Sequence, residues 1–219
     1  LCHGPTYAFK DVALTLLPYL LTASKSKIGD SSSTLILVAT SGDTGKAALE
    51  GFKDVDKTKI MVFYPSDGVS DMQKMQMITQ EGSNVEVVGI KGNFDDAQTA
   101  VKRVFTDAKV KAELKKRNIE LSSANSINWG RLAPQIAYYI SSYVDLVSSE
   151  EISDGDKINF VVPTGNFGDI LAGYYAYKMG LPINKLIVAS NKNKILSDFF
   201  HEGVYDVKRD FYKTASPSM

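Results

Sequence analysis

A strand that breaks into a glycine-rich turn and then continues as a helix constrains this chain most. Residues 157–162 are rich in β-forming side chains, and residues 170–179 have the composition of a helix. The turn that joins them is Gly165-Asn166-Phe167-Gly168-Asp169. Such a turn directs successive backbone N–H groups at one point, where the positive end of the helix dipole also acts. It therefore predicts an anion site, most often a phosphate site, although a tight connection without a ligand is the simpler alternative.

The spacing of the glycines limits the kind of phosphate ligand. It does not match the dinucleotide-binding fingerprint, and no acidic residue follows at the interval that this fingerprint requires. The sequence therefore predicts a phosphate-bearing ligand that is not a dinucleotide.

A second predicted strand, at residues 35–39, ends in the turn Thr40-Ser41-Gly42-Asp43-Thr44-Gly45. The hydroxyl groups of Ser41 and Thr44, together with nearby backbone N–H groups, are suited to hold a carboxylate. The alternative is a βα turn in which Asp43 or Thr44 only caps the following helix. The turn by itself does not decide between these two uses.

Strand-like and helix-like segments alternate along the whole chain. We expect strands at residues 35–39, 60–64, 85–90, 120–123, 157–162 and 186–189. We expect helices at residues 11–24, 46–52, 71–81, 95–116, 129–147 and 170–179. Continuous apolar strands separated by helices indicate an α/β fold with open parallel sheets and helices on both faces. Ligands of such sheets bind beyond the carboxyl ends of the strands, so we expect two lobes with the ligand cleft between them.

Charge, cysteine content and hydropathy narrow the functional classes. Lys+Arg and Asp+Glu balance at 25 each, which gives no electrostatic case for binding nucleic acid or an anionic membrane. The single cysteine, Cys2, cannot form an internal disulfide, which is typical of a reducing compartment such as the cytoplasm. The longest apolar run, residues 12–21, is too short to cross a bilayer and contains Pro18.

A lysine stands at the entrance of the first expected helix. Lys10 is close to the apolar residues Phe9 and Val12, at the end of a helix where a cation is unfavourable. A solvated surface pair of Lys10 with Asp11 is the ordinary interpretation. The functional interpretation is a desolvated amine that is available to form an imine with an aldehyde.

Four motifs in the order of the chain resemble the threonine synthase family. The first is His3-Gly4-Pro5-Thr6 with Phe9-Lys10-Asp11, and the second is the turn at residues 39–45. The third covers residues 122–131, and the fourth is the turn at residues 165–169. Together they span nearly the whole chain, and residues 198–200 and 216–219 fit the family as well.

This resemblance implies a pyridoxal 5'-phosphate enzyme of the tryptophan-synthase-like fold type II. Lys10 would carry the cofactor as a Schiff base, as an internal aldimine, and later move protons at the substrate carbons. The cofactor phosphate would lie on the turn from Gly165 to Asp169, and Asp43 would contact the cofactor ring. Related dehydratases and sulfhydrylases have asparagine in place of Asp43, which favours threonine synthase. The implied substrate contacts are Ser41, Gly42, Thr44, Asn125 and Arg131.

The family reaction converts O-phosphohomoserine and water into threonine and phosphate. The departing phosphate requires cationic partners, for which Arg131 is the preferred candidate and Lys74 a weaker one. For both residues a surface charge is the alternative. Asn125 and Asn128 are expected either to contact substrate or cofactor or to cap the following helix.

The polar stretch 148–157 is the best candidate for a boundary between domains. Residues 1–30 would be the lysine-bearing segment and helix of a larger domain, and residues 31–148 a smaller α/β domain with the substrate turn. Residues 149–219 would be another part of the larger domain with the phosphate turn. We expect the fold to be incomplete at both ends, so that these 219 residues alone have little or no turnover.

Two other functions stay open at this point. A serine/threonine dehydratase would keep the pyridoxal phosphate but change the reaction, and a non-catalytic phosphate-binding module would use both glycine turns as a sensor. For either enzyme we expect a small-molecule substrate, no metal ion, and a monomer or homodimer.

Overall fold

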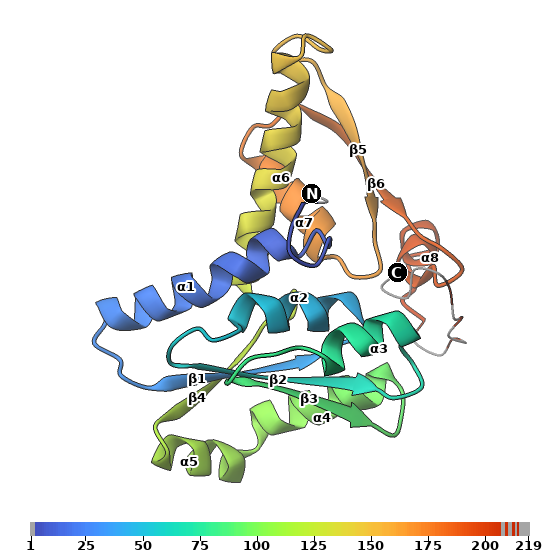
Figure 1. The fold of residues 1–219 in the computed structure, drawn as a ribbon. Helices are drawn as coiled ribbons and strands as arrows, with labels where there is room; N and C mark the ends of the chain where they lie inside the picture. Colours follow the sequence, from blue (N-terminus) through green and yellow to red (C-terminus); the bar gives the residue numbers. More distant parts are fainter. Residues whose placement is uncertain (1–2, 207–208, 210–211, 213, 215–219) are drawn as a thin grey trace. The chain divides into compact units, whose positions relative to one another are not determined.

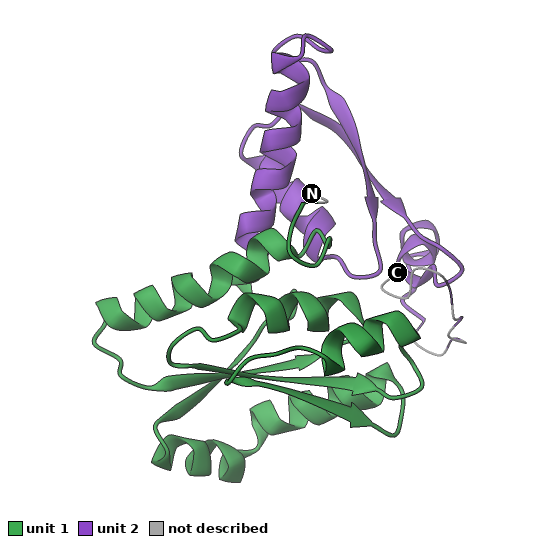
Figure 2. Cartoon of the chain, viewed as in Figure 1, with its two compact units in different colours: residues 1–131 green, residues 132–219 purple. Residues whose placement is uncertain are grey.

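The computed structural model describes residues 3–206, 209, 212 and 214, and the chain divides into two compact units, residues 1–131 and 132–219 (Figure 2). Its elements in chain order are α1 (Asp11–Lys27), β1 (Ser33–Ala39), α2 (Asp43–Phe52), β2 (Thr58–Pro65), α3 (Asp71–Ile78), β3 (Val85–Ile90), α4 (Phe94–Thr106), α5 (Ala108–Lys116), β4 (Ile119–Ser123), α6 (Trp129–Ser148), β5 (Ile158–Pro163), α7 (Gly168–Lys178), β6 (Ile183–Ala189) and α8 (Ile195–Glu202). Within the described residues, no helix combines the length and the apolar character that crossing a membrane requires.

The first unit is built on a four-stranded parallel sheet in the order β3-β2-β1-β4, with helices on both of its faces (Figure 1). Strand β1 shows why both faces are covered. Ile36 and Val38 are buried in one core with side chains of α1, α2 and α3, whereas Leu37 and Ala39 are buried in another with α4. Because successive side chains of a strand point to opposite faces, a continuous apolar strand needs cover on both. The predicted α/β class with an open parallel sheet is confirmed.

Helix α1 packs closely on α2 and so brings the N-terminal segment into the core of the first unit. Leu14 and Leu17 of α1 lie in the same buried cluster as Phe52 of α2. At Gly51 the two helices approach so closely that a Cβ atom would lie 2.2 Å from the carbonyl oxygen of Leu14. Glycine at position 51 therefore fixes the approach of the helix that begins directly after Lys10.

The second unit contains a two-stranded parallel sheet, β5 and β6, with α7 as the connection between the strands. Tyr139 of α6 packs edge-on against Phe160 of β5, with 4.8 Å between the ring centroids. The same ring lies against Gly173 of α7, where a Cβ atom would be 2.6 Å from the Tyr139 ring. One aromatic side chain thus links α6, β5 and α7.

The expected single helix over residues 95–116 is wrong, because the chain leaves the helical conformation at Asp107. The backbone of Asp107 is extended, with φ −74° and ψ 112°, and its carboxylate accepts hydrogen bonds from the N–H groups of Lys109 and Val110 at 2.7 and 3.1 Å. Asp107 therefore caps a new helix, α5, as aspartate commonly does. Helix α8 was not anticipated.

Several boundaries also differ from the sequence-based expectation. Helix α2 begins at Asp43 rather than at residue 46, and α3 ends at Ile78 rather than at residue 81. The two compact units divide between Arg131 and Leu132, at the start of α6. The division of the chain into parts of a larger and a smaller domain stays a prediction.

Candidate active site

The segment before α1 is held on the first turn of that helix by one carboxylate. The buried side chain of Asp11 accepts hydrogen bonds from Thr6 N at 2.9 Å, from Thr6 Oγ1 at 2.5 Å and from Ala8 N at 3.3 Å. Gly4 lies directly against it, since a Cβ atom there would be 2.3 Å from Asp11 Oδ2. The interpretation of Lys10 and Asp11 as a solvated surface pair is therefore wrong.

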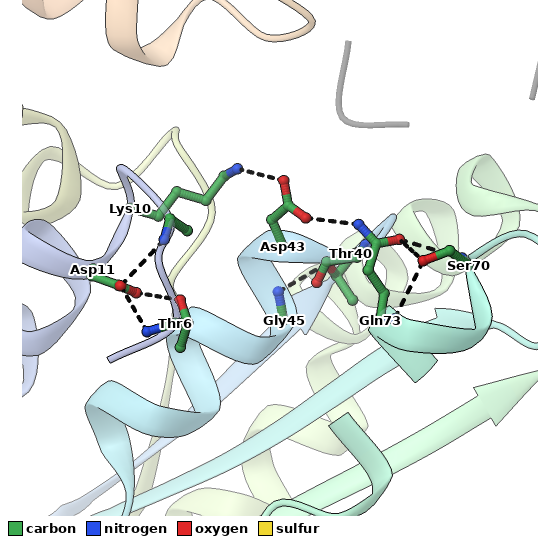
Figure 3. Close-up of polar contacts among 10 residues, drawn as sticks. Thr6, Lys10, Asp11, Thr40, Asp43, Gly45, Ser70 and Gln73 are labelled. Atoms are coloured by element: carbon green, nitrogen blue, oxygen red, sulfur yellow. Dashed lines mark hydrogen bonds and ion pairs between the residues drawn. The ribbon is translucent and has the colours of Figure 1, made fainter. Parts of the chain in front are cut away.

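Lys10 is the N-cap residue of α1, and it is only 6% exposed. Its Nζ atom lies 3.6 Å from Asp43 Oδ2 and 4.5 Å from the centroid of the Phe9 ring (Figure 3). The positive end of the α1 dipole disfavours a cation here, so the Asp43 carboxylate is the compensating charge. The structure thus contains a buried primary amine beside a carboxylate, at the start of a helix.

The turn after β1 is closed by the side chain of Thr40, which is buried directly after the strand. Thr40 Oγ1 accepts hydrogen bonds from Gly42 N at 3.0 Å and from Gly45 N at 2.9 Å. Gly42 has a φ angle of +145° and is the N-cap residue of α2. Asp43 therefore does not serve as the cap, and its carboxylate extends towards Lys10.

The other oxygen of Asp43 is held by a residue that the sequence analysis missed. Gln73 Nε2 donates to Asp43 Oδ1 at 2.7 Å, and Gln73 is itself the third residue of α3 in a capping box with Ser70. The pattern Ser-x-x-Gln was a readable capping signal. The hydrogen bond of Gln73 to a residue 30 positions earlier could not be predicted from the sequence, because the two residues meet only in the folded first unit.

The asparagines of the third motif have structural partners at the carboxyl ends of β1 and β4. Asn125 Nδ2 donates to the carbonyl oxygen of Ala39 at 3.1 Å. Asn128 Nδ2 donates to the carbonyl oxygen of Ser123 at 2.6 Å, and Asn128 Oδ1 accepts from Gly130 N at 2.9 Å, at the start of α6. The expected capping role of Asn128 is confirmed, while a contact of Asn125 with substrate stays a prediction.

Arg131 is buried, with 4% exposure, so the alternative of a surface charge is wrong for this residue. Its Nη1 atom donates to the carbonyl oxygen of Ala124 at 2.8 Å, which ties the guanidinium to the end of β4. Ser41 and Thr44 of the first turn are partly exposed, as is Lys74 on α3. Contacts of these four side chains with a substrate stay predictions.

The turn after β5, in the second unit, begins with Thr164, which is also buried directly after its strand. Thr164 Oγ1 donates back to the carbonyl oxygen of Val162 at 2.7 Å, and Thr164 N donates to Ala189 O at 2.8 Å. Helix α7 then begins at Gly168, and its N-cap residue Phe167 provides no side-chain hydrogen bond to the helix. The start of α7 is therefore suited to an external anion.

Tyr139 supports this turn from the side of α6. Its hydroxyl group donates to the carbonyl oxygen of Asp169 at 2.9 Å and contacts Asp169 Oδ1 at 3.3 Å. Burial of the ring, followed by the nearby Asp169 charge and hydrogen bond, raises the pKa of Tyr139 far above its ordinary value. Tyr139 therefore remains a protonated donor throughout the physiological pH range.

The predicted site residues fall into two groups. The first unit brings together Lys10 and Asp43, with the turn at residues 40–45 and the segment at residues 122–131 at the ends of its strands. The second unit holds the turn Gly165-Asn166-Phe167-Gly168-Asp169. A cleft shared by the two groups stays a prediction, as do the cofactor contacts of both.

Comparison with known proteins gives a consistent result over the whole chain. "Threonine synthase-like 1" of Homo sapiens is 47% identical over 226 residues, covering 100% of this chain and 30% of that protein. "Threonine synthase" of Saccharomyces cerevisiae is 41% identical and is covered over 42% of its length. The chain thus spans less than half the length of these relatives.

Solved structures agree with these relatives. The crystal structure of PLP-bound threonine synthase from Brucella melitensis is 45% identical, with a TM-score of 0.83, and covers 100% of this chain and 44% of that one. Threonine synthase from Escherichia coli is 37% identical with a TM-score of 0.84, over 100% of this chain and 48% of that chain. The family described as pyridoxal-phosphate dependent enzyme matches residues 1–219. This chain therefore belongs to the pyridoxal-phosphate dependent enzymes.

Proposed function

We propose that the full-length protein converts O-phosphohomoserine and water into threonine and phosphate, with pyridoxal 5'-phosphate as its cofactor. The observation that carries this proposal is the buried amine of Lys10 with its partner Asp43, in a chain similar to threonine synthases from end to end. Because the chain spans less than half the length of those relatives, the activity is proposed for the full-length protein.

The residues present fit this cofactor at both of its ends. An aldehyde condenses with an amine, and Lys10 presents a buried primary amine at the start of α1. The start of α7 offers backbone N–H groups and the positive end of a helix dipole to a phosphate. We infer that Lys10 bonds the cofactor and that the turn from Gly165 to Asp169 holds its phosphate.

Magnitudes show that the two ends must act together. A helix N-terminus stabilises a partly buried anion by at most about 2 kcal/mol. Micromolar retention of a ligand corresponds to roughly 8 kcal/mol. The turn after β5 therefore supplies only part of the required affinity, and the covalent bond to Lys10 with enclosure of the ring supplies the remainder.

Pyridoxal phosphate, when bound, supplies an electron sink for the negative charge that develops at substrate carbons. The chain supplies the remaining groups. In this proposal the Lys10 amine takes up and returns protons at those carbons, and Asp43 keeps this amine oriented. The buried guanidinium of Arg131 binds the substrate phosphate, with Lys74 as a weaker second partner. The substrate carboxylate binds at Ser41, Gly42 and Thr44, with Asn125 beside it.

Substrate assays on the full-length protein test this proposal. We expect phosphate release and threonine formation from O-phosphohomoserine, and a loss of at least about a thousandfold in Lys10→Ala. Lys46→Ala is the matched control, because Lys46 lies one turn into α2 but pairs with Glu50. Ammonia release from serine or threonine without phosphate release would instead identify a dehydratase. Equal activity of Lys10→Ala and the wild type would refute the proposal.

We further propose that the protein acts in the cytoplasm, as a monomer or homodimer, on a small-molecule substrate. The single cysteine and the balanced charge support this assignment. Fractionation of cells and the mass of the purified full-length protein in solution would check the compartment and the oligomeric state.

A further inference from the structure

The geometry points to Gln73 as a positioning residue that holds the Asp43 carboxylate in place beside Lys10. The inference rests on the proposed function of Lys10, and it adds a residue from a third helix to that site. The side chain of Gln73 bonds Ser70 and Asp43, so it acts on Lys10 through Asp43.

The first argument is the connected set of hydrogen bonds in Figure 3. Ser70 N and Ser70 Oγ donate to Gln73 Oε1 at 3.3 and 3.2 Å, Gln73 Nε2 donates to Asp43 Oδ1 at 2.7 Å, and Asp43 Oδ2 lies 3.6 Å from Lys10 Nζ. Each carboxylate oxygen of Asp43 therefore has a different partner. A carboxylate held at both oxygens cannot rotate without breaking one of these contacts.

The second argument is the identity of the residue at position 73. In a capping box the third residue of the helix accepts from the N-cap backbone, and glutamate or glutamine can both do so. Glutamate would also interact favourably with the positive end of the α3 dipole. Only glutamine combines this acceptor with an N–H donor for Asp43. The choice of glutamine is thus explained by Asp43 rather than by the helix.

The third argument is the space that the chain leaves for this contact. A Cβ atom at Gly42 would lie 2.4 Å from the Gln73 side-chain amide, and Gly42 has a φ angle of +145° that L side chains rarely adopt. The absence of a side chain at position 42 is what lets the amide reach Asp43. Gly42 and Gln73, 31 residues apart in sequence, are therefore fitted to the same contact.

Two charged side chains close in sequence to Lys10 and Asp43 have other partners. Asp11, the neighbour of Lys10 in sequence, binds Thr6 and the backbone of Ala8. Lys46, on the next turn of α2, pairs with Glu50 and with Gln80. Asp43 pairs with the Lys10 amine, so its orientation affects the charge that this amine experiences.

The test compares Gln73→Glu with Gln76→Glu in the full-length protein. Both changes add one carboxylate to α3, but position 76 is exposed, whereas Gln73 faces Asp43. Urea denaturation checks that both variants are folded, and Gln73→Glu keeps the acceptor of the capping box. It removes the donor to Asp43 and places two carboxylates together near Lys10.

The readout is the pH profile of Lys10 itself. After removal of the cofactor, reductive methylation with formaldehyde and cyanoborohydride is followed by peptide mass spectrometry of the Lys10 peptide. An added negative charge favours the protonated amine. We therefore expect the midpoint of the pH profile of Lys10 methylation to be higher by about 0.5 to 1 pH unit in Gln73→Glu than in the wild type. At neutral pH this is a three- to tenfold slower reaction.

The two proposals fail in different ways. Coincident profiles for the wild type and both variants, or equal shifts in Gln73→Glu and Gln76→Glu, would overturn the role of Gln73. A wild-type protein in which borohydride fixes no cofactor on Lys10 would overturn the proposed function instead. In that case the methylation profile would still report whether Gln73 controls the environment of this amine.

Discussion

The two glycine turns begin with the same residue in the same place, a buried threonine directly after a parallel strand, but its hydroxyl group has different partners in each. Thr40 Oγ1 accepts from two N–H groups of its own turn, those of Gly42 and Gly45. Thr164 Oγ1 donates back to its strand, to the carbonyl oxygen of Val162. In the first turn the threonine therefore binds two backbone N–H groups at the start of α2, whereas in the second its hydroxyl group donates to the strand and the N-cap residue of α7 adds no side-chain bond.

This difference shows that one sequence pattern can produce two kinds of site. In the first turn the backbone is fixed internally, and the functional group is the Asp43 side chain that faces Lys10. In the second turn the backbone at the helix start is itself the expected binding group, and Tyr139 supports it through Asp169. The phosphate site is therefore expected at the second turn, although both turns join a strand to a helix through glycine.

The largest expected effect is that of Gly42→Ala in the first turn. The backbone at this position is strained for any residue with a side chain, and the new Cβ atom would displace Gln73. We expect a loss of about 3 kcal/mol in the free energy of unfolding, measured by urea denaturation of the full-length protein. Gly29→Ala is the control, because Gly29 also has a positive φ of +72° but has nothing within 4 Å of the added atom. A cost for Gly42→Ala no larger than that of the control, about 1 kcal/mol, would contradict the close fit of the turn.

A direct comparison of the two threonines should give the next largest effect. Thr40→Val leaves two N–H donors of the turn without their acceptor, so we expect a loss of about 2 kcal/mol. Thr164→Val removes one donor to a strand carbonyl and should cost about 1 kcal/mol. Urea denaturation of both variants measures the difference. If Thr164→Val were the more damaging change, the contrast between the turns would be wrong.

The next effect is that of Tyr139→Phe, which should lower cofactor affinity at the second turn as well as the free energy of unfolding. The variant loses the hydrogen bond to Asp169, and we expect about 1 kcal/mol less stability and about fivefold weaker pyridoxal phosphate binding. Tyr143→Phe is the matched control on α6, because its hydroxyl group accepts from Gly155 N at 2.7 Å, away from the turn. Titration of both full-length variants with pyridoxal phosphate measures these affinities. An equal loss of affinity in the two would argue against the claim that Tyr139 supports the turn from Gly165 to Asp169.

The smallest expected effect is a loss of stability at alkaline pH that depends on Tyr139. Because the folded state raises the pKa of Tyr139, its contribution to stability is complete below the unfolded value of about 10 and is lost as the pH rises beyond it. Between pH 10 and 10.5 the wild type should lose a few tenths of a kcal/mol more than Tyr139→Phe. Urea denaturation across this range measures the difference, and parallel curves would show that Tyr139 does not titrate in this way.

The fold could be predicted where one kind of interaction dominates. A continuous apolar strand such as β1 was found from composition, because burial on both faces permits little else. The break at Asp107 was missed, because the amphipathic pattern continues across it while a single carboxylate caps a new helix. Local side-chain capping outweighed periodicity at this residue.

The candidate site was predictable only where its residues carry a motif. Lys10, Asp43 and the turn from Gly165 to Asp169 were named from the sequence, and the burial of Lys10 agrees with its proposed role. Gln73 was missed because its partner lies 30 residues away and the contact exists only in the packed unit. The structural use of Asn125 at Ala39 could not be read for the same reason.

The central claim is that the Lys10 amine carries the cofactor, and one measurement tests it most directly. The full-length holoenzyme is reduced with borohydride, digested, and searched by mass spectrometry for the lysine that bears the reduced cofactor. We predict a single modified peptide that contains Lys10. Modification of a different lysine, or of none, would contradict the account.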